Sequence, residues 1–201
     1  MASLSDAKVL GGIGAILILL TALPSIGWLL GIAGFVMVLL AVSNISQIVN
    51  DKKIYDNMRT AVILAVGAIA VGTVTVAGAV YHVLGTGSFI GSKFVLSTTI
   101  TPSDWLGVAV IIIGGLLGVE AFLVASAVFV RRSFNSIGSK LSIKTFETAG
   151  LLYLIGAATA IVGIGFILIL VAEILLAVSF FSIPDQTKMA EPSRAQTVAT
   201  V

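Results

Sequence analysis

The chain has 201 residues, of which 58% are hydrophobic and only 10% are charged. So little polar surface cannot cover a water-soluble domain of this length, which places the chain among integral membrane proteins. The net charge of +2, without a basic stripe interleaved with aromatic residues, argues against nucleic acid as a partner. The absence of cysteine excludes disulfide bonds and thiolate metal sites.

Six apolar stretches predict six transmembrane helices. About 20 apolar residues are needed to cross a hydrocarbon core of about 30 Å. We therefore predict an all-α polytopic membrane protein, with a six-helix bundle over residues 1–183 and a polar C-terminal tail over 184–201 that needs a partner to become ordered. The predicted spans are residues 8–23, 25–47, 59–84, 104–130, 145–161 and 164–183.

Two tight turns are expected, one within 23–25 (Leu-Pro-Ser) and one within 162–165 (Val-Gly-Ile-Gly). Proline disfavours helical geometry in the residue before it, and glycine adopts the left-handed conformation of a sharp reversal. One long helix kinked at Pro24 is the alternative. A cleaved signal peptide is not expected, because residues 1–7 carry no basic cluster and the region after the apolar core is a poor cleavage site.

The basic residues predict the orientation. Lys and Arg near span ends are retained on the cytoplasmic side during insertion. With six spans, ten of the eleven basic residues fall on one side and only Lys93 falls on the other, so both termini are predicted to be cytoplasmic. The ten residues are Lys8, Lys52, Lys53, Arg59, Arg131, Arg132, Lys140, Lys144, Lys188 and Arg194.

The first and last predicted hairpins resemble each other at a shift of 136 residues. The sequence Leu-Leu-Ala-Val-Ser occurs at 39–43 and again at 175–179, and Lys8 aligns with Lys144. The two hairpins are therefore predicted to be repeats of the same orientation, an arrangement found in transporters and in plain bundles.

Small residues at helical spacing predict packing seams, because helices in lipid associate through close backbone approach. A seam can serve contacts within the chain or a partner subunit, including a second copy. The four pairs are Gly27 and Gly31, Ala68 and Gly72, Gly114 and Gly118, and Gly156 and Ala160.

Two carboxyl groups inside predicted spans are the sharpest chemical feature. Glu120 and Glu173 lie in the fourth and sixth spans, Glu173 near the membrane centre by residue count, and could face one another. A charge at that depth costs at least about 2.5–3.5 kcal/mol, so each carboxyl group needs a partner, water or a proton. They are candidates for proton or ion transport, or for a plain hydrogen bond to a backbone carbonyl or to a hydroxyl such as that of Thr159 or Ser126.

An amphipathic segment is predicted around residues 131–144, because apolar residues recur at helical spacing among four basic residues. The apolar residues are Phe134, Ile137 and Leu141. The segment is predicted to lie on lipid headgroups, and a solvated loop is the alternative. His82 is expected to form an interfacial pair with Tyr81 rather than a metal site, and the outer segment 85–103 could dip against the bilayer or meet a partner. The headgroup candidates are Arg131, Arg132, Lys140 and Lys144.

Motifs for catalysis, metal binding or cofactor binding are absent from the sequence, so no enzyme activity is expected. The stretches 3–14, 131–153 and 180–184 resemble a family of polytopic membrane proteins found mainly in archaea, domain of unknown function 996. The resemblance implies an archaeal plasma membrane and carries no activity, cofactor or site residues.

The sequence thus favours a non-catalytic accessory or structural subunit of a larger membrane complex. A small proton- or cation-coupled transporter or channel using Glu120 and Glu173 is the alternative, and a self-associating membrane organiser is a third reading. The expected partners are the lipid bilayer and membrane-protein subunits or further copies of the chain.

Overall fold

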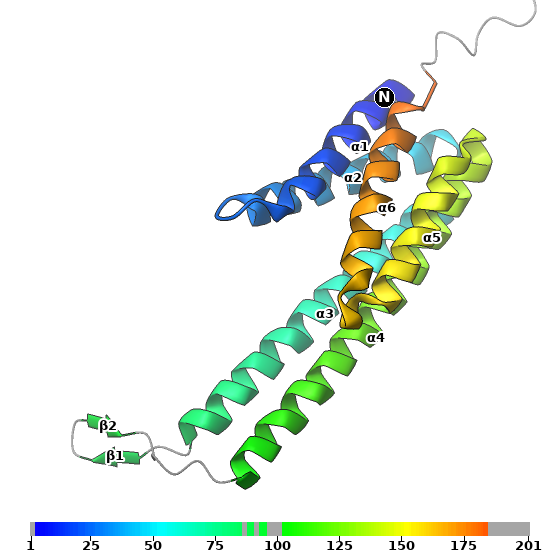
Figure 1. Cartoon of the computed structure of the whole chain (residues 1–201). Helices are drawn as coiled ribbons and strands as arrows, with labels where there is room; N and C mark the ends of the chain where they lie inside the picture. Colours follow the sequence, from blue (N-terminus) through cyan, green and yellow to red (C-terminus); the bar gives the residue numbers. More distant parts are fainter. Residues whose placement is uncertain (1–2, 86–87, 91–92, 96–101, 185–201) are drawn as a thin grey trace, which may run out of the picture. The chain divides into compact units, whose positions relative to one another are not determined.

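The computed structural model describes residues 3–85, 88–90, 93–95 and 102–184. Six α-helices dominate these residues (Figure 1), so the prediction of a helical protein is confirmed and each predicted span overlaps one helix. Single-turn 3-10 helices, Leu20–Ala22 and Ala160–Val162, follow the first and fifth helices. The helices are α1 (Leu4–Leu19), α2 (Gly27–Ile48), α3 (Lys52–Gly85), α4 (Pro102–Leu141), α5 (Lys144–Ala158) and α6 (Ile164–Phe181).

Four of the six helices, α2, α3, α4 and α6, are long and apolar enough to cross a membrane. The other two, α1 and α5, have 16 and 15 residues. At about 1.5 Å per residue they reach about 24 and 22 Å, short of a hydrocarbon core of about 30 Å. Crossing by α1 and α5 therefore stays a prediction, as do the six-span topology and the repeat.

The helices α3 and α4 run beyond the predicted spans. They contain 34 and 40 residues, which is about 51 and 60 Å of helix. The extra turns, residues 52–58 of α3 and 131–141 of α4, carry basic side chains. Charge sets the edge of an apolar span but does not end a helix, because Lys and Arg have nearly the same helix propensity as Leu.

The described chain divides into two compact units. Unit 1 comprises residues 1–61 and 127–201, and unit 2 comprises residues 62–126. Unit 1 thus holds α1, α2, α5 and α6 with the first part of α3 and the last part of α4, and unit 2 holds the remainder of α3 and α4. The prediction of a single bundle over 1–183 stays a prediction.

Unit 1 is built on one apolar core. Within it α1 packs against α2 and α6, and α5 packs against α6. Three buried aromatic rings link α4, α5 and α6: Phe146 lies 6.0 Å from Phe134 and 5.1 Å from Phe180, centroid to centroid. The buried Ser133 hydroxyl on α4 donates a 2.8 Å hydrogen bond to the carbonyl oxygen of Ile54 on α3, so these two helices are joined inside the core.

Glycines bring the helix pairs of unit 1 into backbone contact. A Cβ atom on Gly34 of α2 would lie 2.5 Å from the carbonyl oxygen of Gly14 on α1. One on Gly156 of α5 would lie 2.9 Å from the carbonyl oxygen of Gly165 on α6. In the predicted seams, Gly27 and Gly31 lie against Thr21, so these glycines serve contacts within the chain.

Both predicted turns are confirmed. Ser25 has φ 74° between α1 and α2, and Gly163 has φ 84° immediately before α6. The chain reverses after each 3-10 helix, and α1 and α2 pack along each other, so a single helix kinked at Pro24 is wrong. Asn50 and Ser142 also have positive φ, at the α2–α3 and α4–α5 links.

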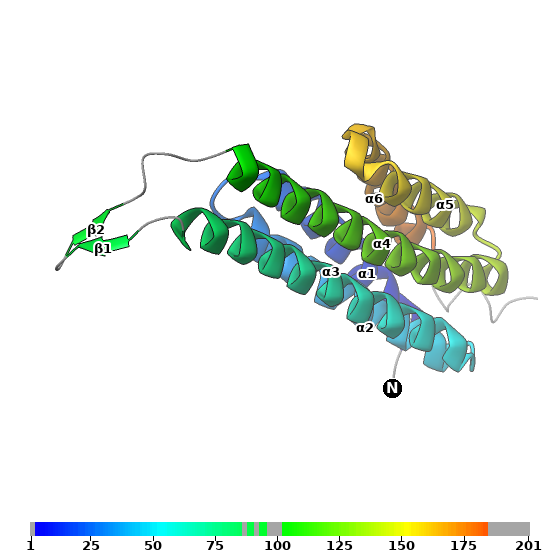
Figure 2. The ribbon, with the colours of Figure 1, turned by 90° about the horizontal axis from the view of Figure 1, so that it is seen from below.

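Unit 2 is a pair of helix segments that lie side by side in Figures 1 and 2. Gly67 lies against Phe122, and Gly115 lies against the side chain of Thr75. A two-stranded antiparallel sheet, β1 (Ser88–Ile90) and β2 (Lys93–Val95), pairs Phe89 with Phe94 between α3 and α4. This sheet was not predicted, although Phe-Ile and Phe-Val on either side of Gly-Ser form a hairpin signal. The rest of the segment 86–101 lies outside the described residues.

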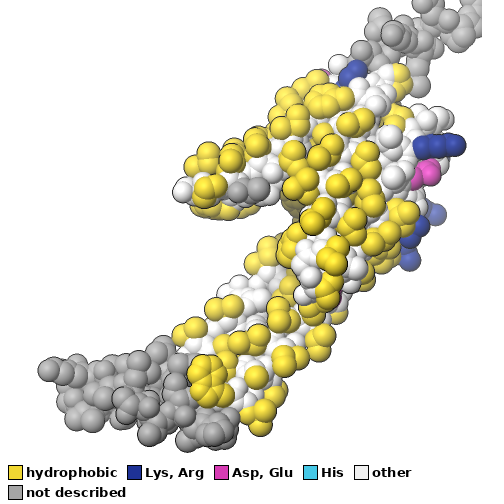
Figure 3. Space-filling model, in the orientation of Figure 1, with side chains coloured by type: hydrophobic (Ala, Val, Ile, Leu, Met, Phe, Trp, Pro, Cys, Tyr) yellow, Lys and Arg dark blue, Asp and Glu magenta, His cyan; other side chains and the backbone are white. Residues whose placement is uncertain are grey.

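Charged side chains gather at one end of unit 1 (Figure 3), where α1, α3 and α5 begin and α2, α4 and α6 end. Eight of the ten basic residues predicted to share a side lie in these helix ends, and the other two, Lys188 and Arg194, lie outside the described residues. The compartment that this end faces stays a prediction.

Replacement of Gly163 by alanine tests the turn before α6. A Cβ atom at Gly163 or at Gly114 would meet no atom of the described chain within 4 Å, but only Gly163 has positive φ. We expect Gly163→Ala to lower the free energy of unfolding by about 1–2 kcal/mol, because an L-residue is strained there. Gly114→Ala is the matched control and should not lower it. Unfolding of both variants in one detergent measures the difference, and equal stability of the two would contradict the turn geometry.

Candidate functional site

Glu173 is the single ionisable residue of α6, an 18-residue helix that is otherwise almost entirely apolar. Glu173 lies on the buried face of α6, which also carries Gly165, Ala172, Leu176 and Phe180. This face packs toward the core of unit 1, and Glu173 is only 8% exposed. The fold therefore directs this carboxyl group inward rather than toward lipid.

The Glu173 side chain lines a small, partly open cavity of about 90 Å³. All six helices contribute to its wall, and Tyr153 is the other residue of the lining with a hydroxyl or charged group. A water molecule occupies about 30 Å³ in the liquid, so the cavity has room for roughly two or three waters. The lining residues are Ile18, Phe35, Val38, Met58, Val130, Phe134, Tyr153, Glu173 and Leu176.

One carboxyl oxygen of Glu173, Oε2, is buried and has no hydrogen-bond partner in the described part of the chain. A buried polar atom without a partner costs about 1–3 kcal/mol. Thr159, a predicted partner, follows the end of α5, and its hydroxyl donates a 2.8 Å hydrogen bond to the carbonyl oxygen of Ile155 in that helix. The arrangement therefore leaves an acceptor or donor available to whatever occupies the cavity.

The cavity lies close to the charged end of unit 1. Its wall includes Met58 and Val130, whose next residues in sequence are Arg59 and Arg131. The depth of Glu173 near the membrane centre, which follows from counting along α6, stays a prediction.

Glu120 lies on α4 in unit 2, half-buried, with its Oε1 atom buried and without a hydrogen-bond partner among the described residues. Glu173 belongs to unit 1, so the prediction that the two carboxyl groups face one another stays a prediction. His82 lies against Gly107, and its Nε2 atom is likewise buried without a partner in the described chain. No group of three or more metal-ligating residues occurs within the described ranges.

The predicted amphipathic segment is wrong in its apolar half. Phe134 and Ile137 are 3% and 0% exposed and belong to the core of unit 1, and Leu141 packs against that core. Residues 131–141 continue α4, so the apolar stripe faces α5 and α6 rather than lipid headgroups. An apolar stripe has the same helical period whether it packs on a neighbouring helix or lies on a membrane surface, so the sequence alone does not distinguish the two.

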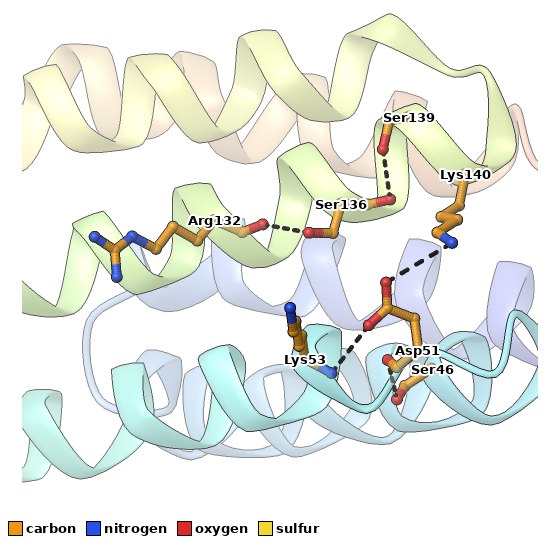
Figure 4. A network of polar contacts seen from close by, with 7 residues as sticks. All are labelled: Ser46, Asp51, Lys53, Arg132, Ser136, Ser139 and Lys140. Atoms are coloured by element: carbon orange, nitrogen blue, oxygen red, sulfur yellow. Dashed lines mark hydrogen bonds and ion pairs between the residues drawn. The ribbon is translucent and has the colours of Figure 1, made fainter.

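The four basic headgroup candidates have different surroundings. Arg132 places its guanidinium carbon 5.3 Å from the ring centroid of Phe129, and Lys140 Nζ lies 3.9 Å from Asp51 Oδ2. Figure 4 shows that Asp51 also accepts a 3.1 Å bond from the Lys53 amide and that its carbonyl accepts one from Ser46. Arg131 lines a polar pocket, and Lys144 is the first residue of α5. Contact of these residues with lipid stays a prediction.

Sequence reasoning missed Tyr153 and Asp51. Asp51 caps α3, and its position directly before Lys52 and Lys53 is an N-cap signal that could have been read. Tyr153 carries no such local signal, because its link to Glu173 depends on how α5 and α6 pack.

Comparison with known proteins finds a family and one curated relative. The model of the family "Protein of unknown function (DUF996)" matches residues 30–174. An uncharacterised protein of Methanocaldococcus jannaschii is 35% identical over 188 residues, which cover 92% of this chain and 96% of the relative. No solved structure matches.

Substitution of Glu173 tests what the buried carboxyl group does. We expect Glu173→Met to raise the free energy of unfolding by about 1–3 kcal/mol, because it keeps the length of the side chain and removes the unpartnered oxygen. Glu173→Gln is the matched control and should give no such gain, since it keeps a polar group in the same place. Unfolding of the purified variants measures both. A loss of stability in Glu173→Met would mean that the cavity contents already satisfy the carboxyl group.

Proposed function

We propose that this chain, which belongs to the DUF996 family of proteins of unknown function, is a non-catalytic accessory or structural subunit of a larger membrane complex. Its four long apolar helices suit a membrane protein. The observation that carries the finer proposal is the apolar surface of unit 2, which its own two helix segments leave uncovered.

Few residues of the α3 and α4 segments of unit 2 are buried. In the most apolar window of each helix, 11% of the α3 residues and none of the α4 residues are buried. Large apolar side chains point outward from both, among them Ile69, Val74 and Leu106. Such a surface needs lipid or the helices of another protein around it.

A groove between α3 and α4 favours helices as the cover. It has a volume of about 380 Å³ and is lined by Gly72, Thr75, Val76, Ala79, Val80, Ile112, Gly115, Leu116 and Val119. Three of these residues are glycine or alanine, which let a neighbouring helix approach closely, and in lipid close approach is what drives helix association. The Thr75 hydroxyl donates to the carbonyl oxygen of Val71 in its own helix, so the groove surface is apolar. We propose a transmembrane helix of a partner subunit as the occupant.

The second candidate function is a small proton- or cation-coupled transporter or channel that uses Glu120 and Glu173. The unpartnered Glu173 oxygen in a water-sized cavity favours it. Against it stands the cavity wall, in which Tyr153 is the one other residue able to continue a proton path. A subunit role requires no such path.

We further propose a multi-pass orientation in the plasma membrane with both termini and the charged end of unit 1 in the cytoplasm, following the retention of basic residues. Single cysteines test it, because the natural chain has none. Ser25→Cys should react with a membrane-impermeant thiol reagent only from outside, and Ser142→Cys only from inside. Three helices, α2, α3 and α4, separate the two positions, so reaction of both from the same side would contradict the crossing of at least one of them.

A groove-filling substitution tests the subunit role. Purified from its native membrane in mild detergent, the chain should carry a foreign membrane subunit in fixed stoichiometry, measured by native mass spectrometry. Ala79→Phe fills the groove and should raise the dissociation constant of the partner at least about tenfold, a change worth about 1.4 kcal/mol. Ala70→Phe, on an exposed part of α3 that does not line the groove, is the matched control and should leave it unchanged.

Other outcomes of this experiment count against the subunit role. If the chain purified only as a homo-oligomer, and Ala79→Phe dissociated that oligomer, the result would indicate a self-associating organiser. A lone monomer that conducts protons or cations in vesicles, with flux abolished by Glu120→Gln and Glu173→Gln, would support the second function.

A further inference from the structure

A polar pocket lies between α4 and α5 in unit 1, apart from the Glu173 cavity. Its volume is about 250 Å³, and its lining consists of Arg131 and Asn135 of α4 with Glu147, Thr148 and Leu151 of α5. Pockets for drug-sized ligands span about 300–1,000 Å³, so this one suits a smaller group. Four of its five residues carry hydrogen-bonding side chains, whereas the apolar residues dominate the rest of the described surface.

Two glycines hold the helices that form the pocket. A Cβ atom on Gly150 of α5 would lie 3.1 Å from the Cα atom of Arg131, and one on Gly138 of α4 would lie 2.8 Å from the Cγ atom of Glu147. Arg131 and Asn135 are four residues apart, as are Glu147 and Leu151, so each pair shares one helix face. The close contacts at Gly150 and Gly138 fix both faces opposite each other.

Arg131 is the available cation in this pocket. It is half-buried and forms no ion pair within the described ranges, whereas Arg132 stacks over Phe129 and Lys140 lies beside Asp51. A guanidinium group presents paired donors that match the oxygens of a phosphate, and the Asn135 amide adds a donor one turn away.

Glu147 makes the pocket more selective than a simple anion site. Its carboxylate lies against Gly138, while Arg131 lies against Gly150, and the two side chains do not pair with each other. A ligand with phosphate alone would meet repulsion from Glu147, whereas a ligand with a phosphate and an ammonium group would find a partner for each. The pocket therefore matches a zwitterion.

The position of the pocket indicates that the ligand is a lipid. Arg131 follows Val130, the last residue of the apolar span predicted for α4, and the exposed Leu151 and Ile155 continue from the pocket along α5. Acyl chains can lie along these residues with the headgroup at the charged end of unit 1. We propose that this pocket binds the headgroup of a phospholipid that carries both phosphate and amine, with Arg131 and Asn135 on the phosphate and Glu147 on the ammonium group.

The test compares three ligands on the full chain, delipidated in detergent, by native mass spectrometry. The ligands are an ethanolamine phospholipid, a glycerol phospholipid without the amine, and inorganic phosphate. We expect the ethanolamine lipid to bind best and Arg131→Gln to weaken it at least about tenfold, or about 1.4 kcal/mol. Arg132→Gln, the adjacent control, should change it less than about twofold, and Glu147→Gln should remove the preference for the ethanolamine lipid over the glycerol lipid.

Arg131→Lys distinguishes a loss of binding from a loss of folding. It keeps the positive charge and the aliphatic part of the side chain but removes the paired guanidinium donors. It should fold like the natural chain and bind the lipid more weakly. Equal losses in Arg131→Gln and Arg132→Gln would show unspecific attraction and overturn the proposal. So would binding of inorganic phosphate as tight as that of the lipid, or unchanged lipid binding in Arg131→Gln and Glu147→Gln.

Discussion

Close backbone approach at glycine is the contact on which unit 1 depends. Between apolar helices in lipid there is no water to expel, so the packing of Gly14 on Gly34 and of Gly156 on Gly165 supplies what the hydrophobic effect supplies in a soluble core. Gly11 and Gly12 then leave space for the rings of Phe180 and Phe181, which lets the last helix lie against the first. A side chain at any of these glycines would separate helices that the rest of the core needs in contact.

This packing also explains how the apolar core accommodates the Glu173 carboxyl group, whose burial is energetically unfavourable. Because all six helices meet around one small cavity, Glu173 is screened from lipid without being given a protein partner for its Oε2 atom. The same helices place Arg131 and Glu147 on facing surfaces a short distance along α4 and α5. Unit 1 therefore combines an apolar interior with two separate polar positions, and both lie toward its charged end.

Helix existence and turns could be predicted from the sequence because they depend on local chemistry. Pro24 and Gly163 mark reversals through their own backbone preferences, and the apolar runs mark the helices. The destination of an apolar stripe could not be predicted: Phe134 and Ile137 have the pattern of a surface helix and are nevertheless core residues. For the same reason the carboxyl groups could be identified as unusual, whereas the cavity around Glu173 and the contribution of Tyr153 depend on packing between distant segments.

The long α3 and α4 helices have a thermodynamic consequence. Phe134 and Ile137 lie in the basic turns of α4, between Arg132 and Lys140. Charged side chains are costly inside hydrocarbon, so we expect water around this part of the core of unit 1. Burial there releases water and contributes a positive heat capacity of unfolding, which helix contacts inside lipid do not. One continuous core would then contain a part whose stability varies with temperature as in a soluble protein, and urea, which acts from the aqueous phase, would weaken that part first.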